Sequence, residues 1–245
     1  MVDGREMPLS EAAVPVTDVG FTHGWSIFET LRAGPGSDPR GHLERLRRSG
    51  DASLIEVPPD AVLRAEIEAV RCKVGTEALV RITLTGDGRR LVWATPLEPG
   101  RRHRPVRCVR GEHVDQAFLD GAVKHRSRMG WSVAVRRAGV DEVLFVDGEQ
   151  RFTEGTSSAV LAVIDGAVWT APWDRRILPS TTLGRLLRHC AARGIAVHRR
   201  GPPAQGPWDA LYIASTTRSL APVVELDGAA LPEGDPVGTA LMEME

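Results

Sequence analysis

The sequence is poor in lysine, in cysteine and in long apolar runs, and these shortages exclude several classes of protein. Its three cysteines are scattered and lack metal-ligand spacing, which is typical of a reduced cytosolic protein. No apolar run approaches the roughly 18 residues of a membrane span, and the first residues show no signal-peptide pattern. The net charge of −1 gives no electrostatic reason to expect a nucleic acid or a membrane surface as partner. We therefore expect a cytoplasmic globular protein without a metal site.

Lysine is the rarer of the two long basic residues by a wide margin. Of the 31 lysines and arginines only two are lysine, Lys73 and Lys124. A lysine amine can lose its proton and attack a carbonyl group, whereas a guanidinium stays charged. A lysine in so arginine-rich a chain therefore indicates a chemical need, and Lys124 is the candidate nucleophile. A surface lysine without function is the alternative interpretation, and composition alone does not decide between the two.

Hydrophobic periodicity predicts strands and helices in both halves of the chain. In the first half it predicts a strand within 21–32, helices that begin near residues 42 and 58, and a hairpin of strands 78–85 and 91–95. In the second half it predicts helices at 124–137 and 182–193 and strands at 106–109, 142–146, 159–164, 168–170, 195–198, 211–214 and 223–226. The Pro- and Gly-containing stretch 98–104 is the predicted linker between an N-terminal domain, 1–97, and a C-terminal domain, 105–245. The mixture indicates an α+β (mixed α/β) architecture.

Three further segments carry groups that bind charged ligands. In 152–158 the carboxylate of Glu154 is followed by small hydroxyl residues, and 212–217 is a strand that ends in hydroxyls. Between them, 177–182 leads into a predicted helix, whose free amides and hydroxyls would make a phosphate site. Each segment also has an ordinary structural explanation, as a surface acid, a turn or a helix N-cap.

Taken in this order, the segments resemble the class IV pyridoxal-phosphate aminotransferase family, which includes D-amino-acid and branched-chain aminotransferases and aminodeoxychorismate lyase. The resemblance covers nearly the whole chain and rests on Asp18–Gly24, Phe28–Arg32, His42–Leu46, Gly139–Glu142, Thr153–Gly155, Ile177–Pro179 and Pro222–Val223. It implies a two-domain enzyme of fold type IV, with an antiparallel sheet in the N-terminal domain and a pseudo-barrel in the C-terminal, cofactor-binding domain. Family members place their site between the two domains and complete it with a loop of a second subunit, so the resemblance also implies a homodimer.

The resemblance implies a role for each matching residue. Lys124 would join pyridoxal 5′-phosphate through a Schiff base and move a proton between substrate and cofactor. Glu154 would keep the ring nitrogen protonated, and Leu178 would pack against the ring face. The phosphate would be bound by Arg45, Thr181, Thr182 and Thr216, and the substrate end of the site would be lined by Thr156, Ser157 and Thr217.

The sequence departs from the family pattern at positions that bear on the cofactor and the substrate. The glycine that commonly follows Leu-Pro in the phosphate turn is Ser180. Where branched-chain enzymes carry a tyrosine, five residues after the lysine, this chain has Met129. The loop 85–90 lacks the Arg-x-His pattern of D-amino-acid transaminases, so the anchor of the substrate carboxylate stays open among Arg81, Arg89 and Arg90.

The predicted function is the transfer of an amino group between an amino acid, with D-amino acids included, or an amine and a 2-oxo acid. The segments 153–158, 215–217 and 222–228 favour this reaction, because they most resemble those of D-amino-acid transaminases. The alternative is an aminodeoxychorismate lyase, which releases 4-aminobenzoate and pyruvate from 4-amino-4-deoxychorismate; Lys124-His125 with Arg128 and the short chain favour it. A non-catalytic protein that binds phosphate ligands is the remaining alternative.

Overall fold

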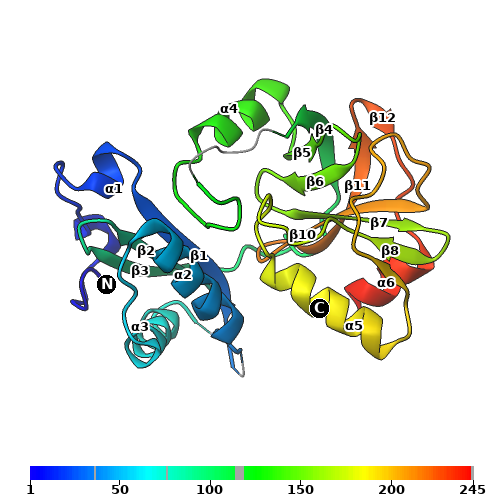
Figure 1. The fold of residues 1–245 in the computed structure, drawn as a ribbon. Helices are drawn as coiled ribbons and strands as arrows, with labels where there is room; N and C mark the ends of the chain where they lie inside the picture. Colours follow the sequence, from blue (N-terminus) through cyan, green and yellow to red (C-terminus); the bar gives the residue numbers. More distant parts are fainter. Residues whose placement is uncertain (36, 76, 114–118, 244–245) are drawn as a thin grey trace. The chain divides into compact units, whose positions relative to one another are not determined.

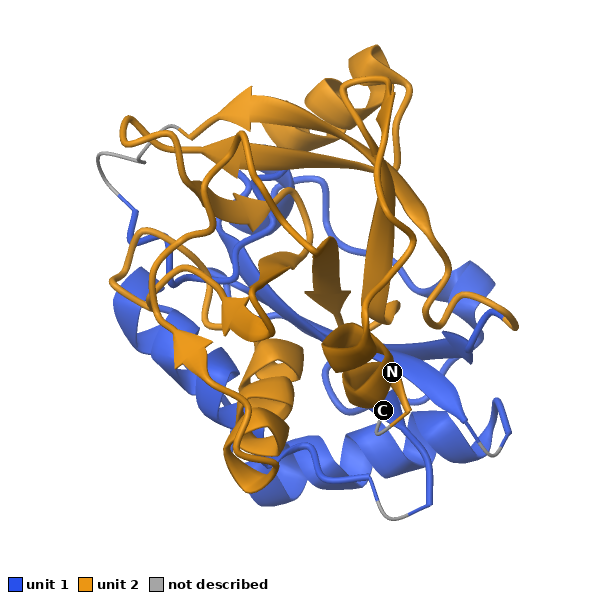
Figure 2. Ribbon diagram, turned by 90° about the vertical axis from the view of Figure 1, so that its right-hand side faces the viewer, with its two compact units in different colours: residues 1–98, 118–128 blue, residues 99–117, 129–245 orange. Residues whose placement is uncertain are grey.

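The chain folds into two compact units. The computed structural model describes residues 1–35, 37–75, 77–113 and 119–243. Unit 1 comprises Met1–Glu98 and Phe118–Arg128, and unit 2 comprises Pro99–Ala117 and Met129–Glu245 (Figure 2). The chain first passes from unit 1 to unit 2 after Glu98, at the start of the predicted linker 98–104. The stretch that carries Lys124, however, belongs to unit 1 and not to the unit that contains most of the second half of the chain.

Unit 1 is a three-stranded antiparallel sheet with two helices on one face (Figure 1). The strands, in spatial order, are β1 (Ser26–Ala33), β2 (Ala78–Thr85) and β3 (Arg90–Pro96), and the helices are α2 (Arg40–Ser53) and α3 (Asp60–Cys72). Because successive side chains of a strand point to opposite faces, every second residue of each strand joins the core. That core contains Ile27, Leu31, Val80, Ile82 and Val92 from the sheet and Leu43, Leu46, Leu63 and Ile67 from the helices. The alternation predicted for 78–85 is confirmed.

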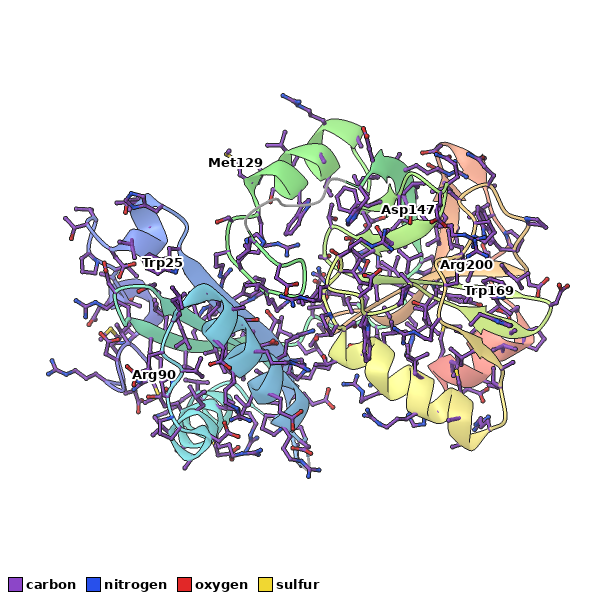
Figure 3. All side chains as sticks on the ribbon, viewed as in Figure 1. Trp25, Arg90, Met129, Asp147, Trp169 and Arg200 are labelled. Carbon is purple, nitrogen blue, oxygen red and sulfur yellow. The ribbon has the colours of Figure 1, made fainter. Side chains whose placement is uncertain are left out.

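The predicted strand within 21–32 is wrong in its first part. A short 3-10 helix, η1 (Leu9–Glu11), comes first, residues Val19–Thr22 form the helix α1, and β1 begins only at Ser26. The cause is Asp18, which is 2% exposed and accepts hydrogen bonds from the amide of Gly20 (2.8 Å) and from Oγ1 of Thr85 (3.0 Å). One buried carboxylate thus caps α1 and ties it to β2. Beside it, the indole of Trp25 (Figure 3) donates to the carbonyl of Ser53.

Unit 2 is built on a closed six-stranded barrel, which confirms the predicted pseudo-barrel. Hydrogen bonding runs in the order β10-β11-β4-β5-β6-β7, and β7 pairs with β10 to close the ring. These strands are β4 (Val106–Glu112), β5 (Glu142–Val146), β6 (Phe152–Gly155), β7 (Ala159–Ile164), β10 (Ala210–Ser215) and β11 (Ser219–Leu226). Each contributes to one interior cluster that includes Val106, Leu144, Phe152, Val160, Ile213 and Val223. The short strands β8 (Ala167–Trp169) and β9 (Val197–His198) continue from β7, and β12 (Ala229–Ala230) pairs with β11.

Two helices cover the outer side of this barrel. The alternate residues of β7 and β10 pack against α5 (Thr181–Ala192) and α6 (Pro236–Met242) in a second cluster, which includes Leu161, Tyr212, Leu183, Leu186 and Leu241. Helix α6 was not predicted from the sequence. It is capped by Asp235, whose carboxylate accepts from the amide of Val237 and from the hydroxyl of Tyr212, both at 2.7 Å. The dipeptide Asp235-Pro236, an N-cap followed by proline at the first helical position, was the available signal.

The helix predicted over 124–137 is wrong at its start. Helix α4 spans Met129–Ala138, and Met129 lies at its first turn, 82% exposed (Figure 3). Its predicted end is confirmed, because Gly139 adopts a left-handed φ of 66°. The residues before Met129 are irregular, and His125 forms an isolated antiparallel bridge with Ile27 at the free edge of β1. Within the described ranges, none of the helices has the length and apolar character that a bilayer crossing requires.

Candidate active site

Lys124 lies in unit 1, in a segment whose backbone is bound by β1 and by α2. Its carbonyl accepts from the amide of Phe28 (3.0 Å), and its amide donates to Oγ of Ser49 on α2 (3.0 Å). Two residues on, the amide of Arg126 donates to the carbonyl of Ser26 (2.9 Å). The backbone of the candidate nucleophile is therefore fixed by the sheet edge and by a helix, which limits where its side chain can point.

The side chain of Lys124 lies over the ring of Phe28. Its Nζ is 4.6 Å from the ring centroid, and the guanidinium carbons of Arg126 and Arg128 are 4.4 Å and 5.9 Å from the same centroid. The pKa of the neighbouring His125 imidazole is lowered. Burial is the largest cause, and the charges of Arg128 and Lys124 add to it. The surroundings of Lys124 in unit 1 are thus strongly positive.

Arg45, predicted to bind phosphate, forms a buried ion pair on the helical face of the same sheet. Glu29 of β1, which is fully buried, accepts from Nε (2.7 Å) and Nη2 (2.8 Å) of Arg45 and contacts Nδ1 of His42 (2.8 Å). Burial alone would raise the pKa of Glu29, but Arg45 and His42 outweigh it and hold this pKa far below its usual range. Glu29 was not identified as a functional residue from the sequence. It fixes two of the three nitrogens of the Arg45 guanidinium.

The three arginines considered as carboxylate anchors differ in their surroundings. Arg89 is paired with Asp3 (2.6 Å), and Arg90 forms a two-pronged pair with the buried carboxylate of Glu66 (Figure 3). Arg81 instead stacks over the ring of Trp93 at 4.6 Å, and it pairs in register with Thr30 on β1. Of the three, Arg81 alone therefore lies on the face of the sheet that carries Phe28.

In unit 2 the structure brings Glu154, Leu178 and the N-terminus of α5 together. Oε2 of Glu154, at the end of β6, accepts from the amide of Leu178 at 3.0 Å. Two residues later Ser180, which replaces the family's glycine, caps α5 by accepting from the amide of Leu183 (3.2 Å). Four of the predicted cofactor-binding residues are thus brought together. Leu178, Thr181 and Thr182 lie in one short segment, and a hydrogen bond joins Glu154 to it.

Thr182 carries the clearest sign of a ligand in this unit. The residue is 1% exposed, and its Oγ1 has no hydrogen-bond partner among the described residues. A buried hydroxyl without a partner costs roughly 1–3 kcal/mol. It sits in the first turn of a twelve-residue helix, where free amides and the helix dipole favour an anion. This first turn fits a bound phosphate group.

Glu142 organises the small-residue turn after β6, a role that the sequence did not reveal. Its carboxylate is buried and accepts from Oγ1 of Thr156 (2.6 Å), from Oγ of Ser157 (2.9 Å) and from the amide of Ser157. Burial raises the pKa of Glu142, while these hydrogen bonds oppose the rise. Thr156 and Ser157, predicted to line the substrate end, therefore donate their hydroxyl hydrogens to Glu142. Only its place in a motif with Gly139 could have drawn attention to this glutamate.

Thr216 and Thr217 lie in the tight turn between β10 and β11. Oγ1 of Thr217 is 3.5 Å from Oγ of Ser215, which also accepts from the amide of Arg218 (3.3 Å). The turn ends at Ser219, which is 1% exposed, has a left-handed φ of 56° and carries a hydroxyl that lacks a partner within the described part of the chain. Ser219 was missed from the sequence. Across the described ranges, no group of three or more His, Cys, Asp or Glu residues is arranged to hold a metal ion.

Comparison with known proteins identifies the family. The model of the family described as amino-transferase class IV matches residues 26–226, most of the chain. The chain belongs to the class IV aminotransferases. This class IV aminotransferase is 26% identical to a Methanocaldococcus jannaschii protein named "Putative branched-chain-amino-acid aminotransferase". The alignment covers 93% of this chain and 87% of that protein. This chain is 23% identical over 96% of its length to 91% of the D-alanine aminotransferase of Bacillus licheniformis.

The fold of this class IV aminotransferase is also that of a solved relative. The branched-chain aminotransferase of Thermoproteus uzoniensis, crystallised with norvaline, superposes with a TM-score of 0.88 at 22% identity, over 100% of this chain and 92% of that one. The predicted fold type is therefore confirmed. Class IV aminotransferases use pyridoxal 5′-phosphate, the cofactor predicted from the sequence. The partnerless hydroxyl of Thr182, the first turn of α5 and the carboxylate of Glu154 fit the phosphate and the ring nitrogen of this group.

Proposed function

We propose that this aminotransferase moves an amino group between an amino acid and a 2-oxo acid, with Lys124 as its catalytic amine. The observation that supports this most is the arrangement in unit 2. A buried hydroxyl without a described partner, Thr182, stands at a helix N-terminus, and four residues earlier the amide of Leu178 is bonded to a carboxylate, Glu154. A phosphate site and a carboxylate so placed are what a phosphorylated pyridine cofactor needs.

The chain's residues would share the binding of the cofactor. Thr181, Thr182 and the amides of the first turn of α5 would bind the phosphate, with Thr216 from the β10–β11 turn and the charge of Arg45 from unit 1. Leu178 would contact the ring face. Glu154, already oriented by the Leu178 amide, would balance a proton on the ring nitrogen.

The cofactor, when bound, supplies a ring that takes up the electron pair released at the substrate α-carbon. Lys124 would hold the cofactor in the resting enzyme, and its Nζ would remove the α-proton of the substrate and return it. The hydrogen bonds to Phe28 and Ser49 fix the backbone of Lys124, so its amine swings on the side chain alone. Thr156, Ser157 and Thr217 would lie at the substrate end, where Glu142 orients the first two hydroxyls.

The choice of an aminotransferase reaction rests on the relatives. The three named above are branched-chain or D-alanine aminotransferases, so the lyase and the non-catalytic alternatives receive no support from them. Their substrates differ in chirality, and the assay must therefore offer both. We also propose that the enzyme is a homodimer, which sedimentation velocity would test.

The chain provides its own control for Lys124. Incubation with pyridoxal 5′-phosphate and reduction with borohydride should fix the cofactor mass on the Lys124 peptide. Lys73, the only other lysine, is exposed and paired with Glu6 (2.8 Å), so Lys73→Ala should keep labelling and activity whereas Lys124→Ala should lose both. Transamination would be measured with D-alanine and L-leucine as donors and 2-oxoglutarate as acceptor. Labelling at Lys73, or activity that survives in Lys124→Ala, would contradict the proposal.

A further inference from the structure

The ring of Phe28 in unit 1 collects an unusual number of cations. The Nζ of Lys124 and the guanidinium groups of Arg126 and Arg128 all lie within 6 Å of its centroid. Contact with an aromatic face stabilises a cation by roughly 0.5–2 kcal/mol and offsets part of the repulsion between like charges. An anion beside this ring would be attracted by all three groups.

The described contacts of Arg126 include no carboxylate. Its Nη2 donates to Oγ1 of Thr83 (2.8 Å), and its guanidinium stacks on Phe28. The pKa of Arg126 is lowered by burial first and then by Arg81 and Arg128. All three effects disfavour its charge, and a bound anion would reverse them. The nearest glutamate in sequence on β1, Glu29, neighbours Phe28 but points to the opposite face of the sheet, where it pairs with Arg45.

The ring of Phe28 brings Arg126 close to the candidate amine. The carbonyl of Lys124 accepts from the amide of Phe28 (3.0 Å), and the amide of Arg126 donates to the carbonyl of Ser26 (2.9 Å), so the start of β1 holds the backbone of both residues. Their charged groups lie 4.6 Å and 4.4 Å from one centroid, so they are at most the sum of these distances, about 9 Å, apart.

We propose that Arg126 is a specificity-determining residue, which binds the second carboxylate of a dicarboxylic amino acid or 2-oxo acid. In a five-carbon dicarboxylate the distal carboxylate lies roughly 4–5 Å beyond the reacting carbon, and an ion pair to the guanidinium spans about 4 Å more. A substrate whose reacting carbon meets Nζ of Lys124 therefore reaches Arg126 with that carboxylate. The inference rests on the proposed function, since it takes Lys124 as the reacting amine.

The other arginines considered in unit 1 are less suited to bind the distal carboxylate. Arg89 and Arg90 are already paired with Asp3 and Glu66. Arg81 stacks on Trp93 of β3, whereas Arg126 and the amine of Lys124 lie over one and the same ring, that of Phe28. A single α-carboxylate is satisfied by one guanidinium, because the planar fork binds both oxygens. The additional positive charge beside Phe28 is what a dianionic substrate requires.

The test compares substrates that differ only in the distal carboxylate. The kcat/KM of the aminated enzyme would be measured with 2-oxoglutarate and with 2-oxopentanoate, in wild type, Arg126→Gln and Arg126→Lys. We expect Arg126→Gln to lower the value for 2-oxoglutarate by about 10²-fold, as loss of a charge-assisted pair of 1.5–3 kcal/mol implies, and to change that for 2-oxopentanoate less than threefold. Arg126→Lys should recover part of the loss. Arg64→Gln, an exposed arginine of α3 that is 4.0 Å from Asp38, is the matched control.

Binding without turnover gives an independent measurement. Glutarate should bind to the wild-type holoenzyme at least tenfold more tightly than pentanoate, and Arg126→Gln should abolish that difference. Equal losses for both 2-oxo acids, or a wild type that does not prefer the dicarboxylates, would overturn the inference while transamination by Lys124 stands. Absence of cofactor labelling and of all transamination in wild type would instead overturn the proposed function.

Discussion

The ion pair of Glu29 with Arg45 gives the sharpest test of how unit 1 is held together. Glu29→Gln keeps the side-chain shape but removes the charge that balances Arg45, which is only 4% exposed. Removal of one partner of a buried pair costs on the order of 3–5 kcal/mol, because the other charge stays buried without compensation. Arg45→Met should cost a similar amount, since it leaves the buried carboxylate of Glu29 with only His42 among its described charged partners.

The double variant decides whether the pair itself is responsible. Glu29→Met with Arg45→Met replaces both charges by apolar groups, so its cost should be lower than the sum of the two single costs by at least ~2 kcal/mol. Hydrogen exchange of the amides of β1 and α2 reports this stability for unit 1 alone. The single variants should lose about two to three and a half orders of magnitude in protection. Glu68→Gln removes the exposed partner of Arg71 on α3 and should change little.

The same pair predicts a dependence on pH. The pKa of Glu29 is depressed in the folded chain, so its contribution to stability is fully present above the unfolded value of about 4.3 and is lost as pH falls further. Wild type should therefore lose protection in β1 and α2 below about pH 4.5, and Glu29→Gln should lose less over that range. Single-variant costs below ~1 kcal/mol, or additive costs in the double variant, would refute the reasoning.

Two further predictions concern the two ends of the proposed site. Thr182→Val removes the partnerless hydroxyl. The free energy of unfolding of the cofactor-free protein, measured in urea, should therefore rise by about 1 kcal/mol, and the Kd for pyridoxal 5′-phosphate should rise roughly tenfold. A less stable cofactor-free variant would contradict this. At Gly24 the φ is 68° and an added Cβ would lie 2.6 Å from Oγ of Ser127. Gly24→Ala should therefore lower kcat by displacing the segment of Lys124, and Gly24→Ala with Ser127→Ala should recover part of it; no recovery would mean that backbone strain alone acts.

The elements that the sequence predicted well are those with a strict local pattern. The alternation at 78–85 and the apolar stripe of α5, with Leu183, Leu186 and Cys190 buried, report one buried face directly. In each case the burial or contact follows from neighbours that the local pattern already implies.

The failures occur where a distant residue determines the local structure. The segment of Lys124 and Arg126 is held by β1, about a hundred residues earlier: the amide of Phe28 donates to the carbonyl of Lys124, and the amide of Arg126 donates to the carbonyl of Ser26. Strand β6 was not predicted, because its residues Phe152–Gly155 become a strand only by pairing with β5 and β7. The donors Thr156 and Ser157 were identified, but not their acceptor Glu142, which precedes them by fourteen and fifteen residues.

Unit 1 is discontinuous in sequence, because the segment at 124–126 belongs to it. A chain cut after residue 98 would retain all three strands of that sheet, yet the start of β1 at Ser26–Phe28 would expose backbone groups that Lys124 and Arg126 normally bind. Uncovered strand edges promote association between chains. During synthesis, residues 99–117, which belong to unit 2, must be made before the segment that covers this edge, so unit 1 stays vulnerable to aggregation until then.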